Sequence, residues 1–284
     1  MRAWILLPIV CVATGCATAP EPVVVKEPFG PPAPEIAMTQ DFAIPVLMYH
    51  RVCDLTPEEA KSPILRDLSV SPKDFEQQVV LMKQEGFTFL HVSEIEKALI
   101  EGKPLPEKAV AITLDDGYRD NFTEAFPILK KYNVKATIFM VTNNFDRPNR
   151  LSWSDARTMN SQAVSFQSHT VSHPDLTLAS DEALRHELVE SKLILEKGLD
   201  STVTSVAYPA GAFDRRVSIA AEDAGYLAAW KKGGGTVQPY CAANPYELPR
   251  IRVHGRTDID KFRQRLMSGT EILAMRARLA DRES

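Results

Sequence analysis

Short apolar runs alternate with longer amphipathic segments along the chain from residue 41 onward. Each apolar run is bounded by turn residues, which favours buried strands. We expect strands at 44–49, 88–92, 110–114, 136–141, 163–167, 203–208, 227–230 and 250–253. The segments between them repeat apolar residues at helical spacing. We expect helices at 72–85, 93–100, 121–132, 181–197, 214–224 and 258–267.

This alternation predicts an α/β fold in which crossover helices join parallel strands. Seven or eight such units between residues 41 and 284 fit a barrel of about seven parallel strands in a single domain. Periodicity alone leaves an open doubly wound sheet as the alternative. Both folds build their sites from loops at the carboxyl ends of the strands, so polar residues there are the candidates for chemistry.

The N-terminus has the layout of an export signal. Arg2 precedes an apolar stretch at 4–12, followed by small residues at 13–15 and then Cys16. This stretch is shorter than the roughly 20 apolar residues of a membrane span. Because Ala-Thr-Gly-Cys resembles a bacterial lipobox, we expect a lipoprotein signal peptide at 1–15 and a lipid on Cys16. The alternative is a plain cleaved signal with an incidental cysteine, and the protein is exported under either interpretation.

Residues 16–40 form a second segment, in which six prolines follow the cysteine and no helical or alternating period is present. Such a composition predicts an extended, semi-rigid tether that could reach roughly 75 Å at about 3.1 Å per residue. We therefore expect an exported lipoprotein anchored in the membrane by its lipid, facing the periplasm or the cell exterior, with the outer membrane favoured. The folded domain is expected at 41–284.

The composition argues against nucleic acid as a partner, and the cysteine count leaves at most one disulfide in the folded domain. The chain has 44% hydrophobic residues, 25% charged residues and a formal net charge of -4, so it offers no basic stripe for nucleic acid. Of its four cysteines, Cys11 leaves with the signal and Cys16 takes the lipid, so Cys53 and Cys241 remain. An oxidising compartment permits a disulfide between them, and two isolated thiols are the alternative.

Chemistry-bearing residues gather at the predicted strand ends. Four of the six histidines stand there, although a single strand-end histidine is usually a hydrogen-bonded loop residue. The complete set is His50, Asp115, Asp116, His169, His173, Tyr208, Pro209 and His254. Their concentration on one predicted rim favours a shared site.

His169 and His173 are spaced to bind one cation. Four residues apart, they could share one face of a helical turn. Catalytic zinc commonly has three protein ligands and one open position, so a third ligand must come from elsewhere. Asp116 can supply it, and a bound cation would relieve its repulsion with Asp115, which is then placed to take a proton from water. The alternative interpretation of Asp-Asp-Gly is a simple turn.

The motifs as a set resemble those of the polysaccharide deacetylases, carbohydrate esterase family 4. The matching stretches are TLDDG at 113–117, SHTVSH at 168–173, AYPAG at 207–211 and LPRIRV at 248–253. The resemblance covers roughly residues 42 to 267 and makes 41–284 the catalytic domain. It implies a distorted (β/α) barrel, a divalent metal, and hydrolysis of the N-acetyl group on N-acetylglucosamine residues.

The resemblance also implies residue roles. Asp115 is the expected base, and Asp116, His169 and His173 are the expected ligands of Zn²⁺, with Co²⁺ or Ni²⁺ as alternatives. The main-chain N–H of Tyr208 is the expected oxyanion donor. Tyr208, Pro209 and Trp153 are the expected substrate contacts, and a packing role for Trp153 is the alternative.

Some positions depart from the commonest family pattern and leave the general acid open. Many members have Arg where this chain has Ala207, and the nearest counterpart of an orienting Asp motif is 151–153 with Asp155 beyond. Together with PVLMYHRV at 45–52, these departures resemble the subgroup that deacetylates poly-β-1,6-N-acetylglucosamine. His50 is the first choice for the acid and His254 the second. Peptidoglycan or chitin oligomers are alternative substrates, and a non-catalytic polysaccharide-binding module is the alternative of another class.

Overall fold

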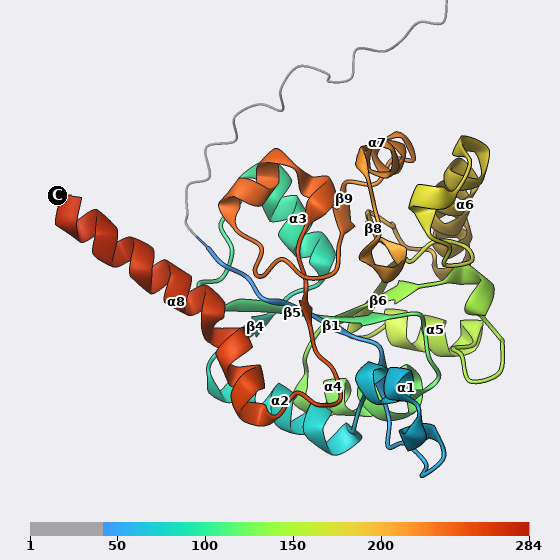
Figure 1. The fold of residues 1–284 in the computed structure, drawn as a ribbon, viewed down its shortest axis with the longest axis horizontal. Coiled ribbons are helices and arrows are strands. Elements are labelled where there is room, and N and C mark those ends of the chain that lie inside the picture. Colours follow the sequence, from blue (N-terminus) through green and yellow to red (C-terminus); the bar gives the residue numbers. More distant parts are fainter. Residues whose placement is uncertain (1–41, 284) are drawn as a thin grey trace, which may run out of the picture. The chain divides into compact units, whose positions relative to one another are not determined.

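Seven parallel strands form the centre of the fold in the computed structural model, which describes residues 42–283 (Figure 1). Their order in the sheet is β10-β1-β5-β6-β7-β8-β9. The strands are β1 (Val46–Tyr49), β5 (Ala109–Asp115), β6 (Ala136–Met140), β7 (Val164–Ser168), β8 (Ser205–Ala207), β9 (Ala228–Trp230) and β10 (Ile251–Arg252). A further strand, β4 (Thr88–Phe89), pairs with β5, while β2 (Arg51–Val52) and β3 (Ser69–Val70) form a separate small sheet. The predicted signal peptide, Cys16 and the tether lie outside the described residues.

The sheet is buried on both faces, as its continuous apolar runs require. All seven residues of β5 are buried, and they alternate between two apolar clusters. Val110, Ile112 and Leu114 face one cluster, whereas Ala109 and Ala111 face the other. Asp115, the last residue of β5, is buried but belongs to neither apolar cluster.

The sheet curls so that its two edges approach each other. Leu248 donates its N–H to the Ala229 carbonyl and accepts from the Lys231 N–H, both at 2.9 Å. These bonds place the segment that leads into β10 beside β9, while β10 itself pairs with β1. The predicted barrel of about seven parallel strands is therefore confirmed, in the form of a distorted half-barrel.

Helices cover both faces of the sheet. In Figure 1, α2 and α4 lie on one side of β1 and β5, and α3 lies on the other. The helices are α1 (Pro63–Leu68), α2 (Pro72–Gln84), α3 (Val92–Glu101), α4 (Phe126–Tyr132), α5 (Trp153–Asn160), α6 (Asp181–Leu199), α7 (Arg215–Asp223) and α8 (Ile259–Glu283). No helix within 42–283 has the length and apolarity of a membrane span.

Most predicted elements are present, with differences that have local causes. The strand expected at 88–92 ends at Phe89 because Val92 already begins α3. The helix expected at 121–132 is split into a π-helical turn (Asn121–Ala125) and α4. Pro127 in the first turn of α4 lacks an N–H and cannot bond back to the preceding turn, which widens there. The short helices α1 and α5 are not among the predicted elements.

Cys53 and Cys241 are both free thiols. The disulfide that the sequence left open is therefore not formed in this structure, and the alternative of two isolated thiols holds.

Candidate metal centre and active site

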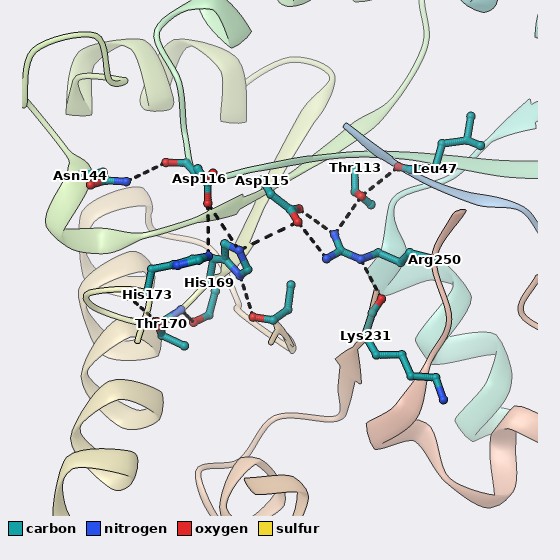
Figure 2. Close-up of polar contacts among 12 residues, drawn as sticks. Leu47, Thr113, Asp115, Asp116, Asn144, His169, Thr170, His173, Lys231 and Arg250 are labelled. Carbon is teal, nitrogen blue, oxygen red and sulfur yellow. Dashed lines mark hydrogen bonds and ion pairs between the residues drawn. The ribbon is translucent and has the colours of Figure 1, made fainter. Parts of the chain in front are cut away.

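Asp116, His169 and His173 converge at the carboxyl ends of β5 and β7 (Figure 2). Asp116 Oδ1 lies 3.6 Å from Nε2 of each histidine, and the three ligand atoms all lie within 4.8 Å of one another. Ligands about 2.1 Å from a tetrahedral zinc ion are about 3.4 Å apart. The spacing therefore fits a single divalent cation held by these three side chains.

The tautomer of His169 suits a metal ligand. Its Nδ1 lies 2.7 Å from the Ala207 carbonyl oxygen, which can only accept, so Nδ1 carries the hydrogen. Nε2 then directs its lone pair toward Asp116. Burial lowers the pKa of His169, while Asp115 and Asp116 act in the opposite direction and do not overcome it. The neutral imidazole that a cation requires is therefore the favoured form.

The loop that carries both histidines is not helical, so the expectation of a shared helical turn is wrong. Thr170 and His173 have φ of 67° and 62°, in the left-handed region, and the His173 N–H donates to Thr170 Oγ1 at 3.0 Å. Glu187 of α6 holds the loop from outside, accepting from the N–H groups of Val171 and Ser172 at 2.8 and 2.9 Å. Two left-handed residues, rather than helical spacing, turn both rings toward Asp116.

Asp115 and Asp116 lie on the same side although they are adjacent. Successive side chains of a strand point to opposite faces. Here His169 Nε2 lies 4.0 Å from Asp115 Oδ2 and 3.6 Å from Asp116 Oδ1. This is achieved because Asp115 ends β5 in the sheet, whereas Asp116 adopts a left-handed φ of 73°.

Arg250 is the partner of Asp115 and completes the site. Its guanidinium donates to both carboxylate oxygens, at 2.7 and 2.9 Å (Figure 2). It also lies over the ring of Phe139, 5.0 Å from the ring centroid. Both side chains are buried. The motif at 248–253 contains Arg250, but only the strand order, in which β1 lies between β10 and β5, shows that this residue lies near Asp115. No pattern in the sequence could assign it this partner.

The ion pair controls the charge of Asp115. Burial raises the pKa of this carboxyl, but Arg250 first, with His169 and His50, outweighs burial and lowers it to about 2. Asp115 is therefore ionised near neutrality, which is the state that a base requires.

A pH dependence of stability follows for the metal-free protein. Because the folded pKa of Asp115 is depressed, its contribution is present above the ordinary value of 3.8 and is lost as pH falls through about 2. We expect this loss to reach roughly 2 kcal/mol, measured as the free energy of unfolding between pH 5 and pH 2. Other carboxylates titrate in this range, so the control is the double variant Asp115→Asn with Arg250→Met, which should lose less. Equal losses in both proteins would contradict the assignment.

The roles predicted for Tyr208 and Pro209 do not fit the structure. The Tyr208 N–H donates to the Trp230 carbonyl at 3.0 Å within the sheet and is not available to an oxyanion. Its side chain is fully buried, stacks on Phe213, and donates to the Tyr246 carbonyl at 3.1 Å. Pro209 is buried as well. A buried tyrosine and a buried proline cannot line a substrate groove.

Ala210 is the exposed residue of this turn. Its backbone angles, φ 54° and ψ 4°, are those of the third residue of a type II turn with Pro209 second, and Gly211 closes the turn on the Tyr208 carbonyl at 2.9 Å. The Ala210 N–H takes no part in that bond. It is therefore the main-chain donor that replaces Tyr208 as candidate.

Trp153 and Asp155 have structural contacts. The Trp153 ring stacks on Phe145 with centroids 3.7 Å apart and lies so close to Gly198 that no larger residue fits there. Asp155 caps α5 together with Ser152 and pairs with Arg119. These contacts support the packing alternative for Trp153 and place Asp155 outside the Asp115–Arg250 pair.

The two candidate acids face different charged groups. His50 follows β1, and Asp115 and Asp116 act on its pKa, which burial lowers and these carboxylates raise. Nδ1 of His50 and Nδ1 of His254 are both buried without a hydrogen-bond partner among the described residues, so this property does not distinguish them. Burial also lowers the pKa of His254, whose charged neighbours are Arg265, Asp67, Arg252 and Arg256. The electrostatic contacts thus associate His50, rather than His254, with the two aspartates.

Comparison with known proteins agrees with this geometry. A family described as polysaccharide deacetylase matches residues 102–229. The putative polysaccharide deacetylase YxkH of Bacillus subtilis is 32% identical over 213 residues, which are 74% of this chain and 71% of that protein. The poly-beta-1,6-N-acetyl-D-glucosamine N-deacetylase of Staphylococcus epidermidis is 28% identical over 227 residues, covering 73% and 78% of the two chains.

A solved structure supports the same assignment. The Streptococcus pyogenes deacetylase PplD, in complex with acetate, superposes with a TM-score of 0.74 at 32% identity, covering 80% of this chain and 99% of that one. The expected fold and family are thus confirmed by sequence and by structure. The chain belongs to the polysaccharide deacetylase family, carbohydrate esterase family 4, and is a hydrolase.

Proposed function

We propose that this chain hydrolyses N-acetyl groups on N-acetylglucosamine residues of an extracellular or cell-envelope polysaccharide and releases acetate. The observation that carries the proposal is the Asp116–His169–His173 cluster, with the ionised Asp115 beside it and held by Arg250. These side chains are a possible metal site and a candidate base in contact with the same imidazole.

A divalent cation bound by Asp116, His169 and His173 would polarise the acetamide carbonyl and make the attacking water more acidic. Asp115 takes the proton from that water, and Arg250 keeps the carboxylate ionised and oriented for the transfer. The Ala210 N–H donates to the oxygen on which negative charge develops. His50, in its protonated form, then gives a proton to the departing nitrogen as the acetyl C–N bond breaks. Acetate is released, the amino group stays on the sugar residue of the polymer, and His50 takes up a proton again while Asp115 gives up the one it took from water.

The role of His50 gives a prediction with a matched control. His50→Ala should retain metal and lower turnover by about 10²–10⁴-fold, as expected for loss of a general acid. His254 follows the last strand as His50 follows the first, and the turnover of His254→Ala should stay within a few-fold of the wild-type value. Steady-state acetate release, with metal content measured on the same samples, compares the two. Full turnover in His50→Ala would transfer the acid role to His254.

A product screen tests the substrate. Oligomers of poly-β-1,6-N-acetylglucosamine are the first candidate, supported by the activity named for the Staphylococcus epidermidis relative and by PVLMYHRV at 45–52. We expect the fastest acetate release from these oligomers, compared with peptidoglycan fragments and chitin oligomers at equal acetyl concentration. Faster release from either of the other polymers would change the substrate and keep the enzyme. The absence of acetate from all three would favour a binding module.

We further propose that the enzyme acts outside the cytoplasm, tethered through a lipid on Cys16. The lipobox-like sequence at 13–16 and the proline-rich stretch that follows support this location. Incorporation of labelled palmitate that is lost in Cys16→Ser is the expected result. Equal labelling of both proteins would contradict it.

A further inference from the structure

The backbone of Asp116 is held from both sides. Its N–H donates to the Phe139 carbonyl at 3.0 Å, which continues the pairing of β5 with β6. Its carbonyl accepts from Asn144 Nδ2 at 3.1 Å and from Arg150 Nη1 at 3.2 Å. Figure 2 shows Asn144 directed at this carbonyl, on the side away from the histidines. Two side-chain donors thus converge on one main-chain oxygen, directly beside the proposed metal ligand.

These two donors can stabilise the left-handed conformation of Asp116, whose φ is 73°. A residue with a Cβ disfavours this region unless its surroundings impose it. In the ordinary extended conformation, the Asp116 carboxylate would point to the face opposite Asp115, away from the histidines. The following residue, Gly117, is also left-handed with a φ of 68°, and an added Cβ there would lie 2.1 Å from Met140 Sδ. Because glycine adopts many conformations, it does not by itself hold Asp116 in the left-handed region.

The loop that supplies the donors is anchored against the Asp116 segment. Leu151 N–H donates to the Gly117 carbonyl and Arg119 N–H donates to the Asn149 carbonyl, both at 3.0 Å. The Arg150 guanidinium also lies 4.0 Å from the centroid of the Tyr118 ring. Two main-chain bonds and one cation–π contact therefore fix the position of Arg150, which makes its donor a rigid one.

We propose that Asn144 and Arg150 are positioning residues for the metal ligand Asp116. They hold its carbonyl, keep the residue left-handed, and so direct its carboxylate toward Nε2 of His169 and His173. The inference rests on the proposed metal role of Asp116 and extends it to residues that touch neither metal nor substrate.

The test is the zinc affinity of the purified protein, measured by competition with a chromophoric chelator. Asn144→Ala and Arg150→Ala should each raise the zinc Kd about tenfold, the scale known for residues that orient metal ligands, and the double variant should raise it further. Arg150→Lys should recover part of the affinity because it retains a donor. The matched controls are Asn143→Ala and Arg147→Ala, which change exposed side chains of the same two types in the same loop.

Metal-free thermal unfolding separates positioning from general destabilisation. The Tm of each metal-free variant should stay within a few degrees of the wild type while its zinc Kd rises. If Arg150→Ala fails to fold, the zinc Kd values of Arg150→Lys and Asn144→Ala are compared with those of the wild type and the controls instead. Wild-type affinity in the variants, or an equal loss in Arg147→Ala, would overturn the inference. A wild-type protein that binds no zinc would instead overturn the metal role itself, so the two failures are distinguishable.

Discussion

Replacing Asp116 with asparagine is expected to abolish stoichiometric metal binding and to reduce acetate release by at least ~10³-fold. The carboxylate is the one anionic member of the three-residue cluster, and both imidazole Nε2 atoms lie 3.6 Å from its Oδ1. Asparagine has nearly the same shape as aspartate but lacks the negative charge that offsets the cation. Its amide NH₂ can also donate a hydrogen bond to the Nε2 lone pairs of the two histidines, which the cation needs. Metal content after dialysis, with acetate release on the same sample, measures both effects.

The neighbouring substitution is the control. Asp115→Asn should retain metal and lower turnover by about 10²–10⁴-fold, because it removes the base and leaves the three ligands in place. Two adjacent aspartates should therefore give two different phenotypes. If both variants lose metal, or both retain it, the division of roles between Asp115 and Asp116 is wrong.

Arg250→Met is expected to produce the largest loss of stability. It leaves the buried Asp115 carboxylate without the two donors at 2.7 and 2.9 Å. Breaking a buried pair by removing one partner costs about 3–5 kcal/mol. Urea unfolding of the metal-free protein should show this as a lower midpoint, and turnover should fall as well, because the base loses its orientation.

The double variant Asp115→Asn with Arg250→Met separates charge from packing. With the buried charge removed, it should recover a large part of the lost stability, since replacing both partners can be nearly neutral. Turnover should stay low in the double variant, because it lacks both the base Asp115 and the guanidinium that orients it. An Arg250→Met protein as stable as the wild type would contradict the role assigned to the ion pair.

The sequence predicts the strands and the site because both depend on local patterns. Continuous apolar runs mark strands buried on both faces, and the polar residues that follow β5 and β7 must meet at one edge of a parallel sheet. Asp115, Asp116, His169 and His173 are therefore found from the sequence. The orientation of the two histidines is not found from the sequence. It depends on left-handed φ angles at Thr170 and His173, and neither residue is a glycine, the residue type that would have indicated such an angle.

The contacts that the sequence does not reveal depend on tertiary geometry. Arg250 reaches Asp115 only because β10 pairs with β1, which in turn pairs with β5. The Tyr208 N–H is used within the sheet because β8 and β9 pair up to Trp230, and the turn that follows then exposes Ala210. Asn144 and Arg150 belong to a loop without any recognisable motif. In each case the missing information is which strand or loop lies next to which.

The most direct test of the account is a paired measurement of metal content and acetate release on the purified protein. We predict one divalent metal per chain and acetate release from N-acetylglucosamine oligomers, with both lost on chelation and in His169→Ala, and with acetate release restored by added Zn²⁺ in the wild type alone. Stoichiometric metal without acetate would make the chain a binding module. Acetate release that survives both chelation and His169→Ala would contradict the proposed site.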